Sequence, residues 1–300
     1  MENNSDNPPG LLSPAGVTKL GLVINAALSA GKLAAGWVFA SQVIFADGLH
    51  SLSDCATDVA VLAGIRISSR PADEDHPYGH RRAMTLVTAV LGLMLLGAAA
   101  FVAYRALRSF AVPQTFHIRP GVPLVLAVAS VIIKEALYHL TVRVGRRVGD
   151  SSVVANAWHH RSDAASSVAA AAGLAAVALG GAKWQFLDHA VALMLCSFLL
   201  LVAVRILSQA ASELMDHAPD PEVIERIGQT VASTRGVRGF HAFRARHLGG
   251  KVEMDIHVQV DPELTVREGH DIASEVRRAV IDCCPHVISV IVHIEPAQET

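Results

Sequence analysis

The chain has 300 residues, of which 52% are hydrophobic and only 17% are charged, and its formal net charge is −2. This composition is too apolar for an ordinary soluble domain and indicates a membrane protein. The absence of a basic excess argues against nucleic acid or an anionic membrane surface as a partner.

The first 14 residues are polar and contain paired prolines, with no basic segment followed by an apolar one. They are not typical of a signal peptide, and we predict a disordered cytoplasmic tail over 1–14. Residues 15–210 hold long stretches that are poor in charge, whereas 211–300 have the composition of a soluble domain. We therefore expect a transmembrane domain followed by a cytoplasmic domain.

A spanning helix needs about 20 mostly apolar residues, and the transmembrane domain offers six such segments. They lie at about 16–40, 43–66, 83–108, 121–143, 153–179 and 185–209. The loops after the second and fourth segments are basic, with Arg70, Arg81, Arg82, Arg143, Arg146 and Arg147. By the positive-inside rule these loops face the cytoplasm, and an even number of spans then leaves both termini inside.

The periodicity changes after residue 216. Helical spacing over 221–234 and 266–283 is interspersed with strand-like alternation over 237–247, 251–260 and 287–294, and Gly249-Gly250 is typical of a hairpin turn. The order αββαβ predicts a small α+β sandwich.

Two of the predicted spanning helices each carry a histidine and an aspartate four residues apart. His50 and Asp54 lie in ADGLHSLSDCATD, and His159 and Asp163 lie in NAWHHRSD. The spacing puts each pair on one helix face, and ionisable groups at membrane depth normally serve a function. Two imidazole nitrogens and two carboxylate oxygens suit Zn²⁺. We therefore predict a metal site at these four residues.

Other polar groups of the spanning helices receive separate predictions. Asp47 lies near the same stripe and is an accessory candidate. His160 points about 100° away from His159, so we expect it to face water or lipid headgroups. Lys134 and Glu135 are adjacent and opposite in sign, which favours a structural ion pair. The alternative for the predicted metal site is that its two pairs never meet and only hydrogen-bond between helices.

The ligand chemistry also predicts proton coupling, because metal binding requires ionised carboxylates and neutral imidazoles. A membrane metallohydrolase is one alternative, but the sequence offers no nucleophile or general base near the ligands. A metal receptor that binds ions without carrying them is another.

Two further groups of candidate ligands lie outside the spans. Asp73, His76 and His80 occupy the second loop, where either a surface metal site or a solvated turn fits the spacing. The cytoplasmic domain carries candidates on its strands and last helix, namely His241, His257, His270, His293 and Glu295. Glu295 shares a strand face with His293, although surface histidines are also common without a metal.

Together these motifs resemble those of the cation diffusion facilitators, a family that includes prokaryotic zinc and iron efflux transporters. ADGLHSLSD, PADEDHPYGH, HHRSD and the spaced tail histidines occur in family order over nearly the whole chain. The resemblance implies a transporter, not an enzyme, that forms a homodimer in the inner membrane. Each chain would have six spanning helices and a cytoplasmic ferredoxin-like domain that senses metal and joins the dimer.

The resemblance also implies roles for particular positions. The predicted intramembrane ligands correspond to the transport site, the second-loop group to a loop site, and the cytoplasmic candidates to a binuclear site. Arg82 and Asp216 resemble a pair that interlocks the dimer at the cytoplasmic surface. Met84 and Glu295 depart from the family pattern, where an acidic residue and an aspartate are frequent.

Histidine at the first transport position resembles zinc-preferring members of the family. Zn²⁺ is therefore the expected ion, both transported and regulatory, with protons as the counter-substrate. Fe²⁺, Cd²⁺, Co²⁺ and Mn²⁺ are the alternatives.

Overall fold

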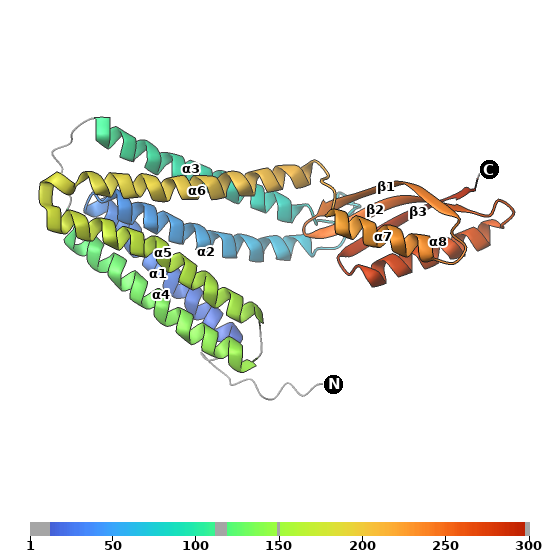
Figure 1. Cartoon of the computed structure of the whole chain (residues 1–300), viewed down its shortest axis with the longest axis horizontal. Helices are drawn as coiled ribbons and strands as arrows, with labels where there is room; N and C mark the ends of the chain where they lie inside the picture. The colour runs from blue at the N-terminus through green and yellow to red at the C-terminus, as the bar shows by residue number, and fades with distance from the viewer. Residues whose placement is uncertain (1–12, 112–118, 149–150, 298–300) are drawn as a thin grey trace. The chain divides into compact units, whose positions relative to one another are not determined.

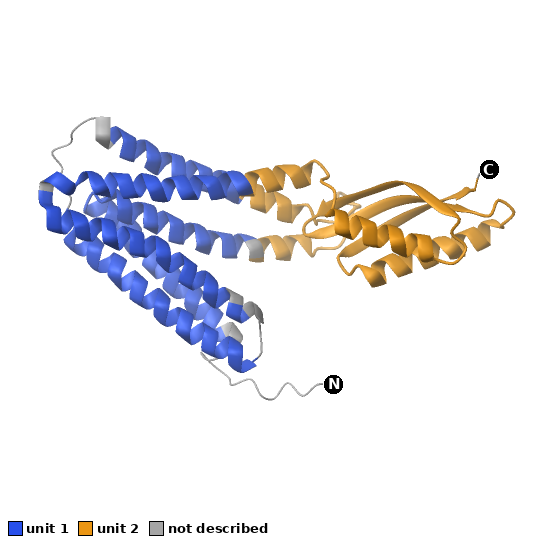
Figure 2. Ribbon diagram, in the orientation of Figure 1, with its two compact units in different colours: residues 1–60, 91–205 blue, residues 61–90, 206–300 orange. Residues whose placement is uncertain are grey.

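The computed structural model describes residues 13–111, 119–148 and 151–297. The chain divides into two compact units (Figure 2). Unit 1 comprises 1–60 and 91–205, and unit 2 comprises 61–90 and 206–300. The tail predicted to be disordered lies almost wholly outside the described residues.

Six long helices occupy the segments that were predicted to span the membrane (Figure 1). They are α1 (Pro14–Val38), α2 (Gln42–Ser68), α3 (Ala83–Ala111), α4 (Gly121–Val148), α5 (Ser151–Gly180) and α6 (Phe186–Leu214), with a 3₁₀ turn, η1 (Gly181–Trp184), before α6. The described part of the chain has five helices that are long and apolar enough to cross a membrane, and α2 is not among them. Its middle carries Asp47, Asp54 and Asp58, which lower its hydropathy. The helical membrane region is confirmed, and a sixth span remains a prediction.

The helices of unit 1 expose large apolar side chains. Leu201 is 69% exposed, Val125 68% and Met94 65%. Apolar surface on this scale is not tolerated on a monomeric soluble protein but suits a lipid environment.

The start of α2 is fixed by a residue from another helix. The Asp188 carboxylate of α6 is fully buried and accepts hydrogen bonds of 2.6 Å from the Ser41 hydroxyl and from the Gln42 amide. An aspartate that meets the free amides at a helix start stabilises that end. This long-range cap ties α2 to α6 within unit 1, and the sequence pattern did not predict it.

The last part of unit 2 forms the predicted α+β fold. Its elements are α7 (Pro221–Ser233), β1 (Gly239–Leu248), β2 (Lys251–Val260), α8 (Val266–Cys283) and β3 (Val287–Pro296). The sheet order is β1-β2-β3, with β1 antiparallel and β3 parallel to β2. The αββαβ order is therefore confirmed. Gly249 and Gly250 adopt φ values of +59° and +76° in the hairpin turn, a conformation that glycine enters without strain.

Alternation along β2 separates the two faces of this sheet. Met254, Ile256 and Val258 are buried and pack in one core with Ile227 of α7 and Val276 of α8. The intervening side chains of β2 lie on the opposite face. That second face carries His241, His257 and His293, three of the four histidines of this domain that were predicted to bind metal.

Candidate metal centres

Three of the four predicted transport-site residues come together in unit 1. His50 and Asp54 of α2 and Asp163 of α5 each offer a ligand atom, and these atoms lie within 4.8 Å of one another. We call these three residues the membrane cluster. Asp163 is buried, and the other two are half-buried. After small side-chain adjustments a single ion could contact all three.

The membrane cluster holds polar atoms with no hydrogen bond. Nδ1 of His50, Oδ2 of Asp54 and Oδ2 of Asp163 are buried and have no hydrogen-bond partner within the described chain. A buried unpaired polar atom costs about 1–3 kcal/mol, so such atoms are rare. Three at one place, all of metal-ligand type, fit a bound cation.

His159, the fourth predicted ligand, lies at the edge of the membrane cluster. Its side chain is 51% exposed, and its Nε2 is 3.6 Å from Oδ2 of Asp163. Among the cluster residues, the contact that the structure gives for His159 is therefore with Asp163.

The prediction that His160 faces water or lipid headgroups is wrong. The residue is only 4% exposed, because α5 packs against α1 as well as α4. A Cβ atom added at Gly21 of α1 would lie 2.9 Å from Nε2 of His160. Gly21 has no side chain and therefore leaves room for the His160 ring. The face of α5 that is turned about 100° from the candidate ligands contacts α1.

The predicted ion pair between Lys134 and Glu135 is also wrong. Lys134 is 1% exposed and donates hydrogen bonds of 3.3 Å to Oγ of Ser51 and to the carbonyl of Asp163. Glu135 lies 3.6 Å from Arg161 of α5 instead. Adjacent residues of a helix point about 100° apart, so they face different surroundings.

Asp47 lies outside the membrane cluster because it has a partner of its own. Nζ of Lys32 in α1 is 2.7 Å from Oδ2 of Asp47, and both side chains are 0% exposed. Lys32 was not among the residues predicted to carry a function. A lysine inside an apolar spanning segment is itself a signal of a buried partner or a function, and it would have been enough to find this pair.

The loop cluster consists of Asp73, His76 and His80 and lies in unit 2, on the segment between α2 and α3. Nδ1 of His76 is 3.0 Å and Nε2 of His80 is 3.3 Å from the Asp73 carboxylate. Although desolvation opposes the effect, hydrogen bonds from the His76 ring and amide lower the pKa of Asp73. The side chains of Asp73 and His76 are more than half exposed, so the cluster is open to solvent.

The tail cluster consists of His241, His257 and Glu295 on the open face of the sheet. His241, His257 and His293 are direct neighbours across the three strands. The Glu295 carboxylate accepts hydrogen bonds of 2.7 Å from both His241 and His257. The His241 hydrogen bond is the largest cause that lowers the pKa of Glu295. These contacts hold the carboxylate ionised between two imidazoles.

Two other predicted ligands lie near the tail cluster. Nε2 of His293 is 3.6 Å from Glu295. His270 belongs to α8 and is exposed. It lies outside the cluster and lines, together with His293, a cavity of about 490 Å³.

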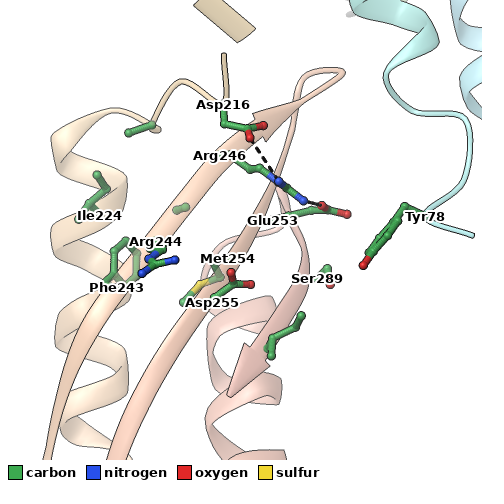
Figure 3. A pocket seen from close by; sticks show the side chains of 13 residues that line it. Tyr78, Asp216, Ile224, Phe243, Arg244, Arg246, Glu253, Met254, Asp255 and Ser289 are labelled. Carbon is green, nitrogen blue, oxygen red and sulfur yellow. Dashed lines mark hydrogen bonds and ion pairs between the residues drawn. The ribbon is translucent and has the colours of Figure 1, made fainter. Parts of the chain in front are cut away.

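Arg82 and Asp216 are in contact within one chain. Nη2 of Arg82 lies 2.5 Å from Oδ1 of Asp216, and Arg246 of β1 lies 3.4 Å from the second oxygen. Arg246 also lies 3.3 Å from Glu253 of β2, so a chain of ion pairs runs along a cavity of about 550 Å³ that Tyr78 also lines (Figure 3). The Arg82 hydrogen bond lowers the pKa of Asp216.

Two family models match consecutive parts of the chain. The cation efflux transmembrane domain matches residues 18–215, and the cytoplasmic domain of cation efflux proteins matches residues 219–297.

Individual relatives are similar over almost the whole chain. Metal tolerance protein C1 of Arabidopsis thaliana is 34% identical over 295 residues, which are 94% of this chain and 62% of that protein, so the chain spans less than two thirds of its length. The manganese efflux system protein MneP of Bacillus subtilis is 31% identical over 288 residues, which are 93% of this chain and 95% of that protein.

Among solved structures, the nickel form of a MamM CTD variant is 32% identical, with a TM-score of 0.26, and the match covers 26% of this chain and all of that one. The two family models together account for both parts of the fold. The chain therefore belongs to the cation efflux family, the cation diffusion facilitators, and is a multi-pass membrane protein.

Proposed function

We propose that the protein exports a divalent transition-metal ion from the cytoplasm, with Zn²⁺ as its first substrate, in exchange for protons. The observation that carries the proposal is the membrane cluster, whose ligand atoms lie within 4.8 Å of one another in a unit of membrane-type helices. One imidazole nitrogen and two carboxylate oxygens suit Zn²⁺, and rotation of His159 would add a fourth ligand.

Proton exchange follows from the same ligands. A metal ion binds ionised carboxylates and neutral imidazoles, so each binding event displaces protons from the site and each release allows protons to return. Alternating access of this site to the two sides of the membrane would then couple the two fluxes.

The transported metal can be identified by comparing the flux of several divalent ions. Carboxylate ligands suit Mn²⁺, whereas imidazole suits Zn²⁺, Fe²⁺ and other first-row ions, and the cluster mixes both types. A relative is named as a manganese efflux protein. Zn²⁺ is favoured by His50, and Mn²⁺, Fe²⁺, Cd²⁺ and Co²⁺ complete the set to be tested.

We further propose a homodimer in the inner membrane with both termini in the cytoplasm. The arginines of the second loop and of the C-terminal end of α4 support this orientation. The match to the cytoplasmic domain of cation efflux proteins supports association through unit 2. The loop and tail clusters would bind regulatory metal, and Arg82 with Asp216 would brace the cytoplasmic surface.

The test is metal uptake by proteoliposomes that contain the full-length chain and a trapped metal-sensitive dye. We expect Zn²⁺ flux that rises with an opposing proton gradient and falls to the rate of protein-free liposomes in Asp54→Asn and Asp163→Asn. Equal flux in these variants would overturn the site. Flux that ignores the proton gradient would overturn the exchange alone, and metal binding without flux would identify a receptor.

A further inference from the structure

A buried polar network lies beside the membrane cluster and joins α1, α2, α4 and α5. Its centre is the ion pair of Lys32 and Asp47, in which both side chains are fully buried. The hydroxyls of Ser166 and Ser167 also donate to the Asp47 carboxylate, at 2.8 Å and 3.1 Å. The charge of Asp47 is therefore balanced by Lys32, and its carboxylate is not free to bind a metal ion.

Lys134 belongs to the same network but has no carboxylate partner of its own. Its ammonium donates to Oγ of Ser51 and to the main-chain carbonyl of Asp163, both at 3.3 Å. Among the described residues, no carboxylate oxygen lies within ion-pair distance of it. Ser51 also accepts from Lys32 at 3.3 Å, so two ammonium groups share one hydroxyl and only Lys32 has a counter-ion.

The carboxylates that offset the Lys134 charge are those of the membrane cluster. Lys134 holds the main chain of Asp163, whose buried Oδ2 has no hydrogen-bond partner in the described chain, and Oδ2 of Asp54 is in the same state. The ammonium of Lys134 is therefore held at the main chain of one member of the membrane cluster. An isolated buried charge is costly in a low-dielectric interior, so each sign stabilises the other.

This arrangement changes the charge balance of the metal site. Two aspartates alone would be neutralised by a dication. With the ammonium of Lys134 beside them, the empty site keeps a single negative charge, and a bound dication leaves the site with an excess of positive charge. Repulsion between Lys134 and the ion opposes binding, while attraction between Lys134 and the carboxylates favours the empty state.

We propose that Lys134 is a built-in competitor of the transported ion, a fixed cation that weakens metal binding at the membrane cluster and promotes metal release. The proposal rests on the proposed function and deepens it, because a transporter must bind its cargo weakly enough to let it go. Lys134 does not coordinate the metal ion. Its positive charge changes the net charge of the site that the ligands form. It is a positioning residue of the site.

The test measures Zn²⁺ affinity by equilibrium dialysis on the full-length chain in nanodiscs of uncharged lipid. The background carries His76→Ala, His241→Ala and His257→Ala, so that the loop and tail clusters do not compete. Lys134→Met removes the charge at similar length, and Lys134→Gln removes it while keeping hydrogen-bond donors for Ser51 and the Asp163 carbonyl.

We expect both neutral variants to bind Zn²⁺ more tightly, by about tenfold or more, and Lys134→Arg to bind as the wild type does. Damage to the fold weakens binding, so a tighter site has no trivial structural cause. In proteoliposomes the neutral variants should show a lower half-saturating metal concentration together with a lower maximal rate.

The matched control is the double variant Lys32→Met with Asp47→Asn, which removes one charge of each sign from the same network. Its affinity should stay within about threefold of the wild type. Unchanged or weaker binding in both neutral Lys134 variants, while Asp163→Asn abolishes binding, would overturn this inference and leave the transport site standing. Unchanged binding in Asp163→Asn would instead overturn the proposed function.

Discussion

The membrane cluster and the tail cluster use the same kinds of ligand in opposite states. In unit 1 the ligand atoms of Asp54 and Asp163 are buried and, within the described residues, lack hydrogen bonds. In unit 2 the Glu295 carboxylate already accepts two hydrogen bonds of 2.7 Å, from half-exposed or exposed histidines. The difference teaches that a bound ion would meet oxygens without a hydrogen bond in the membrane cluster, whereas in the tail cluster it would compete with hydrogen bonds that are already formed.

The two states predict different energetics. An ion that enters the membrane cluster contacts buried atoms that have no hydrogen bond within the described residues, so it forms interactions that these atoms otherwise lack. An ion that enters the tail cluster must first replace hydrogen bonds between the ligands. Loss of a ligand should therefore abolish function in unit 1 and only shift the response to metal in unit 2.

The largest effect is expected from Asp163→Asn. The amide keeps the size of the side chain but removes a ligand charge, so Zn²⁺ flux should fall to the background of empty liposomes. Because Asp54 still offsets the Lys134 charge and the empty site loses its excess negative charge, the metal-free variant should melt at the same temperature as the wild type or higher. Proteoliposome flux and thermal unfolding without metal measure the two effects. Lower stability together with lost flux would mean that Asp163 is a structural residue.

The next largest effect is expected from Lys32→Met, because it leaves Asp47 buried without its counter-ion. Breaking one side of a buried ion pair costs about 3–5 kcal/mol. The metal-free protein should unfold at lower denaturant concentration, and the added Asp47→Asn change should restore most of the loss. A double variant that is no more stable than Lys32→Met would show that the pair is not the cause.

The two units differ in how much of their structure the sequence predicted. The elements of the cytoplasmic domain were predicted almost to the residue, because alternation on β2 and the glycine pair at 249–250 specify a half-buried hairpin. The αββαβ order followed from that pattern. What the pattern does not contain is the register, which sets His241, His257 and His293 side by side across three strands.

In unit 1 the spacing of four residues predicted the ligand pairs, and three of their members meet. The errors concern the residues beside them. His160 was placed by its offset from one helix face, which assumes a single buried face. Lys134 was paired with Glu135 because the two residues are adjacent and opposite in sign. Helix α5 packs against α1 as well as α4, so a side chain turned away from the ligands meets another helix. Whether such a side chain is buried depends on how the helices pack, and the local sequence pattern does not specify that packing.

A smaller effect is expected at the tail cluster. Glu295→Gln removes the charge that two histidines share, so metal affinity there should fall by roughly tenfold. Maximal flux at saturating metal should change little. Metal titration of the full chain with Asp163→Asn and His76→Ala as background isolates this cluster. Loss of maximal flux in Glu295→Gln would contradict the division between the two units.

The smallest effect is expected from Asp216→Asn, which removes an exposed contact with Arg82 worth about 1 kcal/mol or less. The pKa of Asp216 is lower in the folded protein than its ordinary value, so the contact stabilises fully above about pH 4. That contribution is lost as the pH falls through the folded pKa. Unfolding of wild type and variant should differ at neutral pH and converge in acid. A difference that grows in acid would contradict the assignment.

The central claim is that one ion is held by His50, Asp54 and Asp163 among the helices of unit 1. X-ray absorption of Zn²⁺ bound to the full chain, with the loop and tail histidines replaced by alanine, tests it most directly. We predict a first shell of nitrogen and oxygen at about 2.0–2.2 Å, with an imidazole signal that weakens in His50→Ala. Sulfur scattering, which would come from Cys55 next to Asp54 in the sequence, or a spectrum that is unchanged in His50→Ala, would contradict this claim.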